Sequence, residues 1–247
     1  MSYILEVCAD SVQSAVAAQE GGAGRVELCS ALVIGGLSPS AAMFRQVKEN
    51  TDLKIRVLLR PRFGDFCYDE YEFQTLAEEV QQFRELGADG VVIGILKPDG
   101  TINMEQMAEL VNAAKGIGIT MHRAFDVCSN PYEALEQCVS LGIDTILTSG
   151  QRSCAWEGRE LLSELVRRAD GRIDILAGAG IGPEVIRELA DYTGVRSFHM
   201  SGKKVLDSRM EFRRSGVPMG IPGFSEFEIW QTDADQVRRT AEILKER

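Results

Sequence analysis

The sequence is poor in basic residues, and this shortage argues against two classes of partner. Lys and Arg number 27 against 37 Asp and Glu, which gives a formal net charge of −10 over 247 residues. Proteins that bind nucleic acids carry a basic surface, and so do proteins that dock on anionic lipids. We therefore expect neither a nucleic acid nor a membrane as partner. A small anion stays compatible with the composition, because a few local arginines can attract it.

Long apolar runs and paired cysteines are missing as well. No run approaches the roughly 18 apolar residues that indicate a membrane span. The first residues, MSYILEVCAD, lack a basic segment, and Glu6 interrupts their short apolar run, which is unlike a signal peptide. The six cysteines include no CxxC pair, which favours reduced thiols over a disulfide framework or an ordinary structural zinc site. We expect a soluble cytoplasmic protein.

A strand followed by a helix is the repeating unit of this sequence. Successive predicted strands begin 21 to 37 residues apart, which suits a βα unit with short loops. We expect strands at residues 4–8, 25–29, 54–60, 91–96, 118–122, 145–148, 174–177 and 197–200. We expect helices at residues 11–20, 40–50, 71–86, 104–115, 132–141, 158–168, 183–192 and 233–245.

Eight such units without a linker predict an α/β protein, a single (βα)8 TIM barrel over residues 1–247. The alternative is an open doubly wound sheet, but no G-x-G-x-x-G follows the first strand. Pro131 and Pro183 are each expected at the first position of a helix. Segment 203–232 is too long for an ordinary βα loop, so we expect it to cross the top of the barrel or to form a subunit contact.

Charged residues take strand positions that branched apolar side chains normally fill in a barrel core. Glu6 and Cys8 in the first strand, and Glu27 and Cys29 in the second, alternate with apolar residues that face the helices. Arg60 ends the third strand on the same inward face. Since active sites of such barrels lie at the carboxyl ends of the strands, these groups predict a site there. The structural alternative is a layer of ion pairs with no ligand.

The stretch HRAFD at the end of the fifth strand adds further chemistry. We expect Arg60 to bind a small anion and His122 and Glu27 to act as the acid–base pair, because histidine titrates near neutral pH unless its surroundings shift it. Glu27 and Arg60 are expected to pair in the free protein. Asp126 is expected to orient His122 or to bind a substrate hydroxyl.

Loop residues around this position are candidates for binding the substrate. The turn AGAGIGP after the seventh strand leads into a predicted helix, whose N-terminus would suit a phosphate or carboxylate. The same glycines are also explained by a tight turn, and His199 by a hydrogen bond within the core. The substrate-binding candidates are Glu6, Arg62, Asp65, Arg123, Gly178, Gly180 and Ser201.

Cys8 and Cys29 are the candidate metal ligands. They are expected at equivalent positions of adjacent strands, where two thiolates can hold a soft metal such as Cu(I). The alternative is a pair of small residues that fill the barrel.

Several segments together resemble the CutC copper-homeostasis family. They are, in order, EVCADS, GGAGRVELCSAL, GGLSPS, RPRFGDFCY, HRAFD, ILTSGQ and AGAGI. The resemblance implies a cytoplasmic TIM barrel that forms a homodimer or higher homo-oligomer and binds copper, with Cys8 and Cys29 as Cu(I) ligands. The family's polar motifs carry over to Arg60, Arg62, Asp65, His122, Arg123 and Asp126. Phe63 departs from the pattern, since glycine is common there, and is expected to narrow the mouth of the barrel.

Two main hypotheses follow. The first is a copper-homeostasis protein that binds Cu(I) through Cys8 and Cys29. The second is a TIM-barrel lyase, isomerase or hydrolase for a small anionic metabolite, with only an indirect link to copper. Glu6 and Glu27 favour the second, because carboxylates raise the pKa of nearby thiols and so oppose thiolates. A non-catalytic interaction scaffold is the third alternative.

Overall fold

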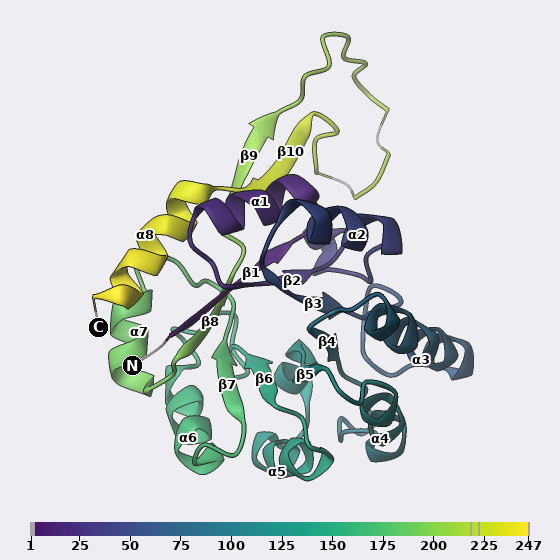
Figure 1. The fold of residues 1–247 in the computed structure, drawn as a ribbon, viewed down its shortest axis with the longest axis vertical. Coiled ribbons are helices and arrows are strands. Elements are labelled where there is room, and N and C mark those ends of the chain that lie inside the picture. Colours follow the sequence, from purple (N-terminus) through teal and green to yellow (C-terminus); the bar gives the residue numbers. More distant parts are fainter. Residues whose placement is uncertain (1–2, 218, 222, 247) are drawn as a thin grey trace.

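Eight parallel strands close into a barrel in the order β1 to β8 in the computed structural model, which describes residues 3–217, 219–221 and 223–246 (Figure 1). The barrel strands are β1 (Ile4–Ala9), β2 (Arg25–Leu28), β3 (Lys54–Leu58), β4 (Gly90–Ile93), β5 (Gly118–Met121), β6 (Thr145–Thr148), β7 (Asp174–Ala177) and β8 (Ser197–Met200). The helices around them are α1 (Val12–Glu20), α2 (Ala41–Asn50), α3 (Glu70–Glu85), α4 (Met104–Ala113), α5 (Pro131–Leu141), α6 (Arg159–Ala169), α7 (Ile186–Thr193) and α8 (Ala234–Lys245). The predicted TIM barrel is confirmed.

Capping side chains explain where most helices begin. Ser11 and Ser40 accept hydrogen bonds from the first turns of α1 and α2, and Asp69 forms a capping box with Glu72 at α3. Asn130 caps α5 with proline at its first position, as predicted. The predicted start of α7 at Pro183 was wrong. The residues after Gly182 form a turn in which Val185 and Ile186 both donate to the Gly182 carbonyl, so this helix begins at Ile186.

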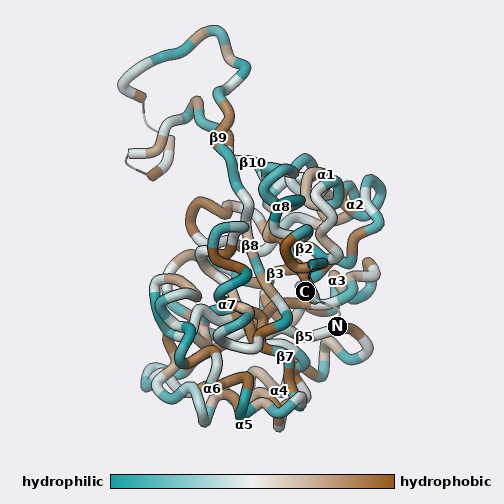
Figure 2. The backbone as a smooth tube through the Cα atoms, turned by 90° about the vertical axis from the view of Figure 1, so that its left-hand side faces the viewer, coloured by the Kyte–Doolittle hydropathy of each residue, from teal (hydrophilic) through white to brown (hydrophobic). Residues whose placement is uncertain are grey.

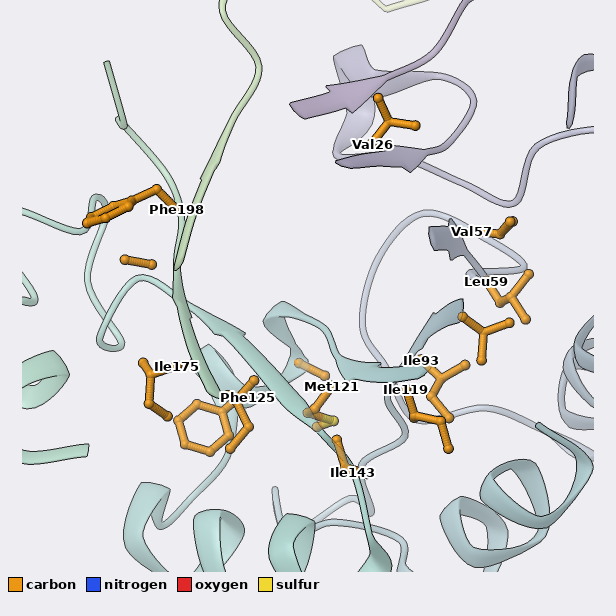
Figure 3. Close-up of a cluster of buried hydrophobic side chains, with 14 of the residues drawn as sticks. Val26, Val57, Leu59, Ile93, Ile119, Met121, Phe125, Ile143, Ile175 and Phe198 are labelled. Atoms are coloured by element: carbon orange, nitrogen blue, oxygen red, sulfur yellow. The ribbon is translucent and has the colours of Figure 1, made fainter. Parts of the chain in front are cut away.

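Apolar side chains of the strands form the core between barrel and helices. Val26, Val57 and Ile119 project from β2, β3 and β5, and Phe198 comes from β8 (Figure 3). Alternate residues of the same strands therefore face the barrel interior, as the sequence pattern predicted. Among the described residues, no helix has both the length and the hydrophobicity to cross a bilayer.

Residues 203–232 form an arm that extends away from the barrel beyond α1 (Figures 1 and 2). Its base is an antiparallel pair of strands, β9 (Lys203–Asp207) and β10 (Glu228–Thr232). The expectation that this segment crosses the top of the barrel is therefore wrong, because the paired strands direct it outward. The alternative expectation, a subunit contact, stays a prediction.

Candidate functional site

A cavity of about 280 Å³ lies at the carboxyl ends of the barrel strands, where the sequence predicted a site. Its volume is just below the range of about 300–1,000 Å³ that is typical of ligand pockets. Its polar lining is Cys8, Glu27, Arg60, His122, Arg123, His199 and Ser201, and its main apolar lining is Leu32, Leu58, Phe66, Leu147, Ile181 and Met200. Two short 3₁₀ helices, η1 (Leu32–Ile34) and η2 (Arg123–Val127), follow β2 and β5 near it.

Arg60 is a buried cation that pairs with no carboxylate of the described residues. Its side chain donates from Nη1 to the Gly36 carbonyl at 3.3 Å and from Nη2 to the Gly64 carbonyl at 2.7 Å. Its Nε–H is buried and has no partner in the described part of the chain. The expected pair with Glu27 is therefore not formed, because two loop carbonyls hold the guanidinium. A buried charge without a counterion is costly, which makes Arg60 the candidate side chain for binding an anion.

His122 lies beside Arg60 and is neutral at physiological pH. Burial and then the charge of Arg60 lower its pKa to about 3. Its Nδ1 accepts the Ala124 N–H at 3.2 Å, so the proton is on Nε2, which is buried and has no partner among the described groups. The expectation that His122 titrates near neutral pH is thus corrected by its burial: it is a hydrogen-bond donor.

The glycine at position 94 makes room for this imidazole. A Cβ built there would lie 2.6 Å from two atoms of the His122 ring, so a larger residue would displace the ring. His122 also packs on Phe66, whose ring centroid lies 4.8 Å away. Phe66 also lies under the Arg60 guanidinium, at 5.0 Å. One aromatic ring therefore positions both candidate ligand-binding side chains.

A chain of buried charges runs from the barrel interior to the cavity. Arg25 pairs with Glu6 through its Nε, and Glu6 accepts a hydrogen bond from His199 Nδ1 at 2.8 Å. His199 Nε2 in turn lies 3.7 Å from Glu27 Oε2. Glu6 is therefore occupied by Arg25 and His199 and is not among the cavity-lining residues. Glu6 therefore fits the structural alternative, in which these charges form a layer of ion pairs without a ligand.

The two glutamates of this chain have opposite pKa shifts. Burial raises the pKa of Glu6, but the His199 hydrogen bond and the charge of Arg25 outweigh it and hold the pKa at about 2. Burial is the largest effect on Glu27 and raises its pKa to about 7. Burial also opposes protonation of His199, yet Cys8 and Glu27 raise its pKa well above the usual value. Glu27 is thus the group that exchanges a proton near neutral pH.

Asp126 does not orient His122. Its carboxylate accepts hydrogen bonds from the backbone N–H groups of Ser149 and Gln151 and from the Thr148 hydroxyl, and it pairs with Arg123 at 2.6 Å. These donors occupy both oxygens, so Asp126 fixes the loop after β6. Arg123 lines the cavity, but Asp126 already balances its charge.

Arg62 and Asp65 lie outside the cavity. Arg62 pairs with Asp65 at 2.8 Å and with Glu72, and it donates to carbonyls of its own loop. These contacts hold the β3–α3 loop together, which explains both residues without a ligand. Phe63 is 68% exposed and does not line the cavity, so the expectation that it narrows the mouth is not supported.

The glycine-rich loop after β7 contributes only in part. Gly180 lines the cavity, as does Ser201 after β8. Gly178 does not, and a Cβ there would lie 2.6 Å from Leu147, so packing explains that glycine. Because α7 begins at Ile186, the loop does not present the predicted helix N-terminus to a ligand.

The two candidate copper ligands are not at the same level. Cys8 is the register partner of Glu27, which places Cys29 two residues farther along the chain, directly after β2. Cys8 lines the cavity, whereas Cys29 is fully buried beside Leu58. Burial, followed by the proximity of Cys8, raises the pKa of Cys29 well above its usual value. No cluster of three or more metal-binding side chains occurs among residues 3–217, 219–221 and 223–246.

The sequence indicated too small a role for His199 in the site and gave no signal for Phe66. His199 is paired in register with Glu6 across the closing strands β1 and β8. Closure of the barrel was predicted, so the inward position of Glu6 could have indicated an inward partner on β8. Phe66 is a loop residue, and no periodic pattern marks it.

Comparison with known proteins identifies relatives along nearly the whole chain. The CutC family model matches residues 3–204. The family protein CutC of Bacteroides fragilis (strain YCH46) is 46% identical over 98% of each chain. The copper homeostasis protein cutC homolog of Mus musculus is 40% identical and covers 99% of this chain and 90% of its own.

Solved structures agree with this match. A crystal structure of CutC from Streptococcus agalactiae superposes with a TM-score of 0.76 and is 30% identical over 81% of this chain and 98% of its own. Phosphoribosylanthranilate isomerase from Thermotoga maritima superposes over the full length of both chains with a TM-score of 0.58, but at 14% identity it shows only the shared fold.

Proposed function

Since the chain belongs to the CutC family, whose mouse relative is named a copper homeostasis protein, we propose that the residues lining the barrel cavity carry the function of this protein. We propose that the protein is a TIM-barrel enzyme that binds a small anionic metabolite and performs acid–base chemistry on it. The observation that carries this proposal is Arg60, 8% exposed, without a carboxylate partner among the described residues, and with an unpaired Nε–H.

Three side chains have separate tasks in this proposal. Arg60 attracts the anion, and the Nε2–H of neutral His122 donates a hydrogen bond to it. Glu27 lines the same cavity and transfers the proton, because its pKa of about 7 leaves both protonation states populated at neutral pH. His199, held by Glu6, keeps a positive charge near Glu27 and so stabilises its ionised form.

The loss of ligand-induced stabilisation in an Arg60→Met variant tests this function. A panel of carboxylated and phosphorylated metabolites should raise the thermal unfolding midpoint of the parent protein but not that of Arg60→Met. Arg62→Met is the matched control, since Arg62 lies in the same loop and its ion pairs are outside the cavity. If no anion stabilises the parent, or if Arg60→Met responds equally, the anion site is refuted.

Cu(I) binding by Cys8 and Cys29 is the second candidate. Two inward-facing thiols from adjacent strands match the soft ligands that Cu(I) prefers, and the raised pKa of Cys29 reflects in part its proximity to Cys8. Burial keeps the Cys29 thiol protonated and accordingly weakens this candidate. The metal would be a cargo, and its binding would release the thiol protons.

Competition against a chromogenic Cu(I) chelator tests the copper site. The reduced parent protein should take Cu(I) from the chelator, and the Cys8→Ser, Cys29→Ser double variant should lose the tightest site. Cys154→Ser, which removes a loop thiol, should behave as the parent does. Equal affinity in the parent and the double variant would assign copper to other groups.

We further propose a cytoplasmic homodimer held by the arm. Tip residues Met210 and Phe212 are 58% and 67% exposed, and residues 209–214 around them include three arginines and one glutamate. A groove of about 430 Å³ at the base of the arm is lined by apolar side chains, among them Val33 and Trp230, together with acidic Asp10, Glu226 and Glu228. The basic, apolar tip of one copy is complementary to the acidic, apolar groove of a second.

A further inference from the structure

The charges around the cavity define the ligand more closely than the word anion does. Arg123 is balanced by Asp126, and His199 faces Glu6 and Glu27. Among the described residues that line the cavity, Arg60 is then the one cation without an opposing carboxylate. A ligand with a single negative charge balances it, whereas a phosphate carries about −1.5 to −2 at neutral pH.

Two nitrogens of the cavity lining have no hydrogen-bond partner. Each Nη of Arg60 donates one of its two N–H groups to a loop carbonyl, of Gly36 or Gly64, and Nδ1 of His122 accepts from the Ala124 backbone. Among the described residues that line the cavity, Arg60 Nε and His122 Nε2 are the buried side-chain nitrogens left without any partner. An unpaired buried donor destabilises the free protein, so a ligand that accepts from both removes two penalties.

The arrangement around these donors is rigid. The two side chains pack against the same Phe66 ring, and the backbone at Gly94 lies close against the His122 ring. Two fixed N–H donors suit the two oxygens of a planar carboxylate. A tetrahedral phosphate has three terminal oxygens and is left with one more acceptor to satisfy. The remaining wall near them is apolar, with Leu58, Leu147, Ile181 and Met200.

We infer that the ligand is a small monocarboxylate, with one oxygen on Arg60 Nε–H, the other on His122 Nε2–H, and its carbon chain against the apolar wall facing Glu27. This inference rests on the proposed anion site and narrows its substrate class. The cavity of about 280 Å³ limits the ligand to a short carbon skeleton. In this position Glu27 is available to take a proton from the ligand and to return it, so the transfer needs no additional reactant.

Matched carboxylates and phosphonates test the inference directly. The probes are propanoate, lactate and pyruvate, each against the phosphonate of the same skeleton (ethylphosphonate, 1-hydroxyethylphosphonate and acetylphosphonate). Binding is followed by broadening of the ligand proton resonances in the presence of the full-length protein. We expect each carboxylate that binds to do so about tenfold more tightly than its phosphonate, because its two oxygens match the two unpaired donors.

Two variants separate charge from geometry. Arg60→Lys keeps the positive charge but lacks the planar Nε–H, so we expect carboxylate affinity to fall about tenfold. Arg62→Lys is the control and should bind as the parent does. Thermal unfolding establishes that each variant is folded.

The outcomes distinguish this inference from the anion site itself. Phosphonates that bind as tightly as carboxylates, or more tightly, overturn the monocarboxylate class and leave the anion site in place. Equal carboxylate affinity in Arg60→Lys also overturns it, because charge alone would then suffice. If the carboxylates, the phosphonates and inorganic phosphate all fail to bind, both the inference and the proposed function are refuted.

Discussion

Burial acts differently on each ionisable side chain of the cavity, depending on what lies beside it. His122 has Arg60 as a neighbour and loses its proton, whereas His199 has Cys8, Glu27 and Glu6 and keeps it. Two histidines on strand ends of one barrel thus differ in charge. Sequence alone predicted both positions. It could not predict the charges, because these depend on side chains from other strands and loops.

Glu27 should make the stability of the protein depend on pH. A glutamate in the unfolded chain ionises near its ordinary pKa of 4.5, but the folded pKa is about 7. Between these values the folded state holds a proton that the unfolded state has released. The free energy of unfolding therefore falls as pH rises through this interval.

We expect Glu27→Gln to remove this loss of stability. Relative to the parent, the variant should gain about 1–3 kcal/mol at about pH 8 and much less at about pH 5. Urea unfolding at both pH values measures the difference. Glu85→Gln, an exposed position on α3, is the control. A gain of equal size at both pH values would contradict the assigned pKa of Glu27.

At the scale of elements, the strands followed from the sequence and the loops did not. Predicted and observed strands begin within one residue of each other, because alternating apolar residues mark them. The roles that the sequence predicted for Asp126 and Arg62 were wrong for a physical reason. Asp126 is bound by Ser149 of the loop after β6, and Arg62 is bound by Glu72 of α3. No periodicity of the sequence reports such contacts.

The arm is the element whose removal should change the assembly and not the barrel. Lys203 and Thr232 are partners across its base, so residues 204–231 can be replaced by a short turn. We expect the shortened protein to stay folded and to be a monomer, because the exposed tip and the groove are removed together. Light scattering after size exclusion gives the mass of both proteins.

A point substitution controls for the size of that deletion. Phe212→Ser with Met210→Ser keeps the arm but makes its tip polar, and it should also yield a monomer. A parent protein that is already monomeric at the same concentration would refute the proposed contact.

The whole molecule carries a net charge of −10. Among the described residues that line the cavity, however, the one charged side chain without an opposite charge beside it is a cation, Arg60. The sequence predicted the barrel, the end of the barrel that holds the cavity, and that Arg60, His122 and Glu27 meet there. It placed Cys8 and Cys29 at one level, whereas their strands are offset by two residues. Register between strands is a property of the closed barrel, which explains this difference.

A structure from crystals of the protein grown with lactate tests most directly the central claim, a carboxylate site at Arg60 and His122. The account predicts a carboxylate within hydrogen-bond distance of both Arg60 Nε and His122 Nε2, with Arg60 still bound to the Gly36 and Gly64 carbonyls. An Arg60 side chain paired with Glu27 in a cavity that stays empty of lactate would contradict it.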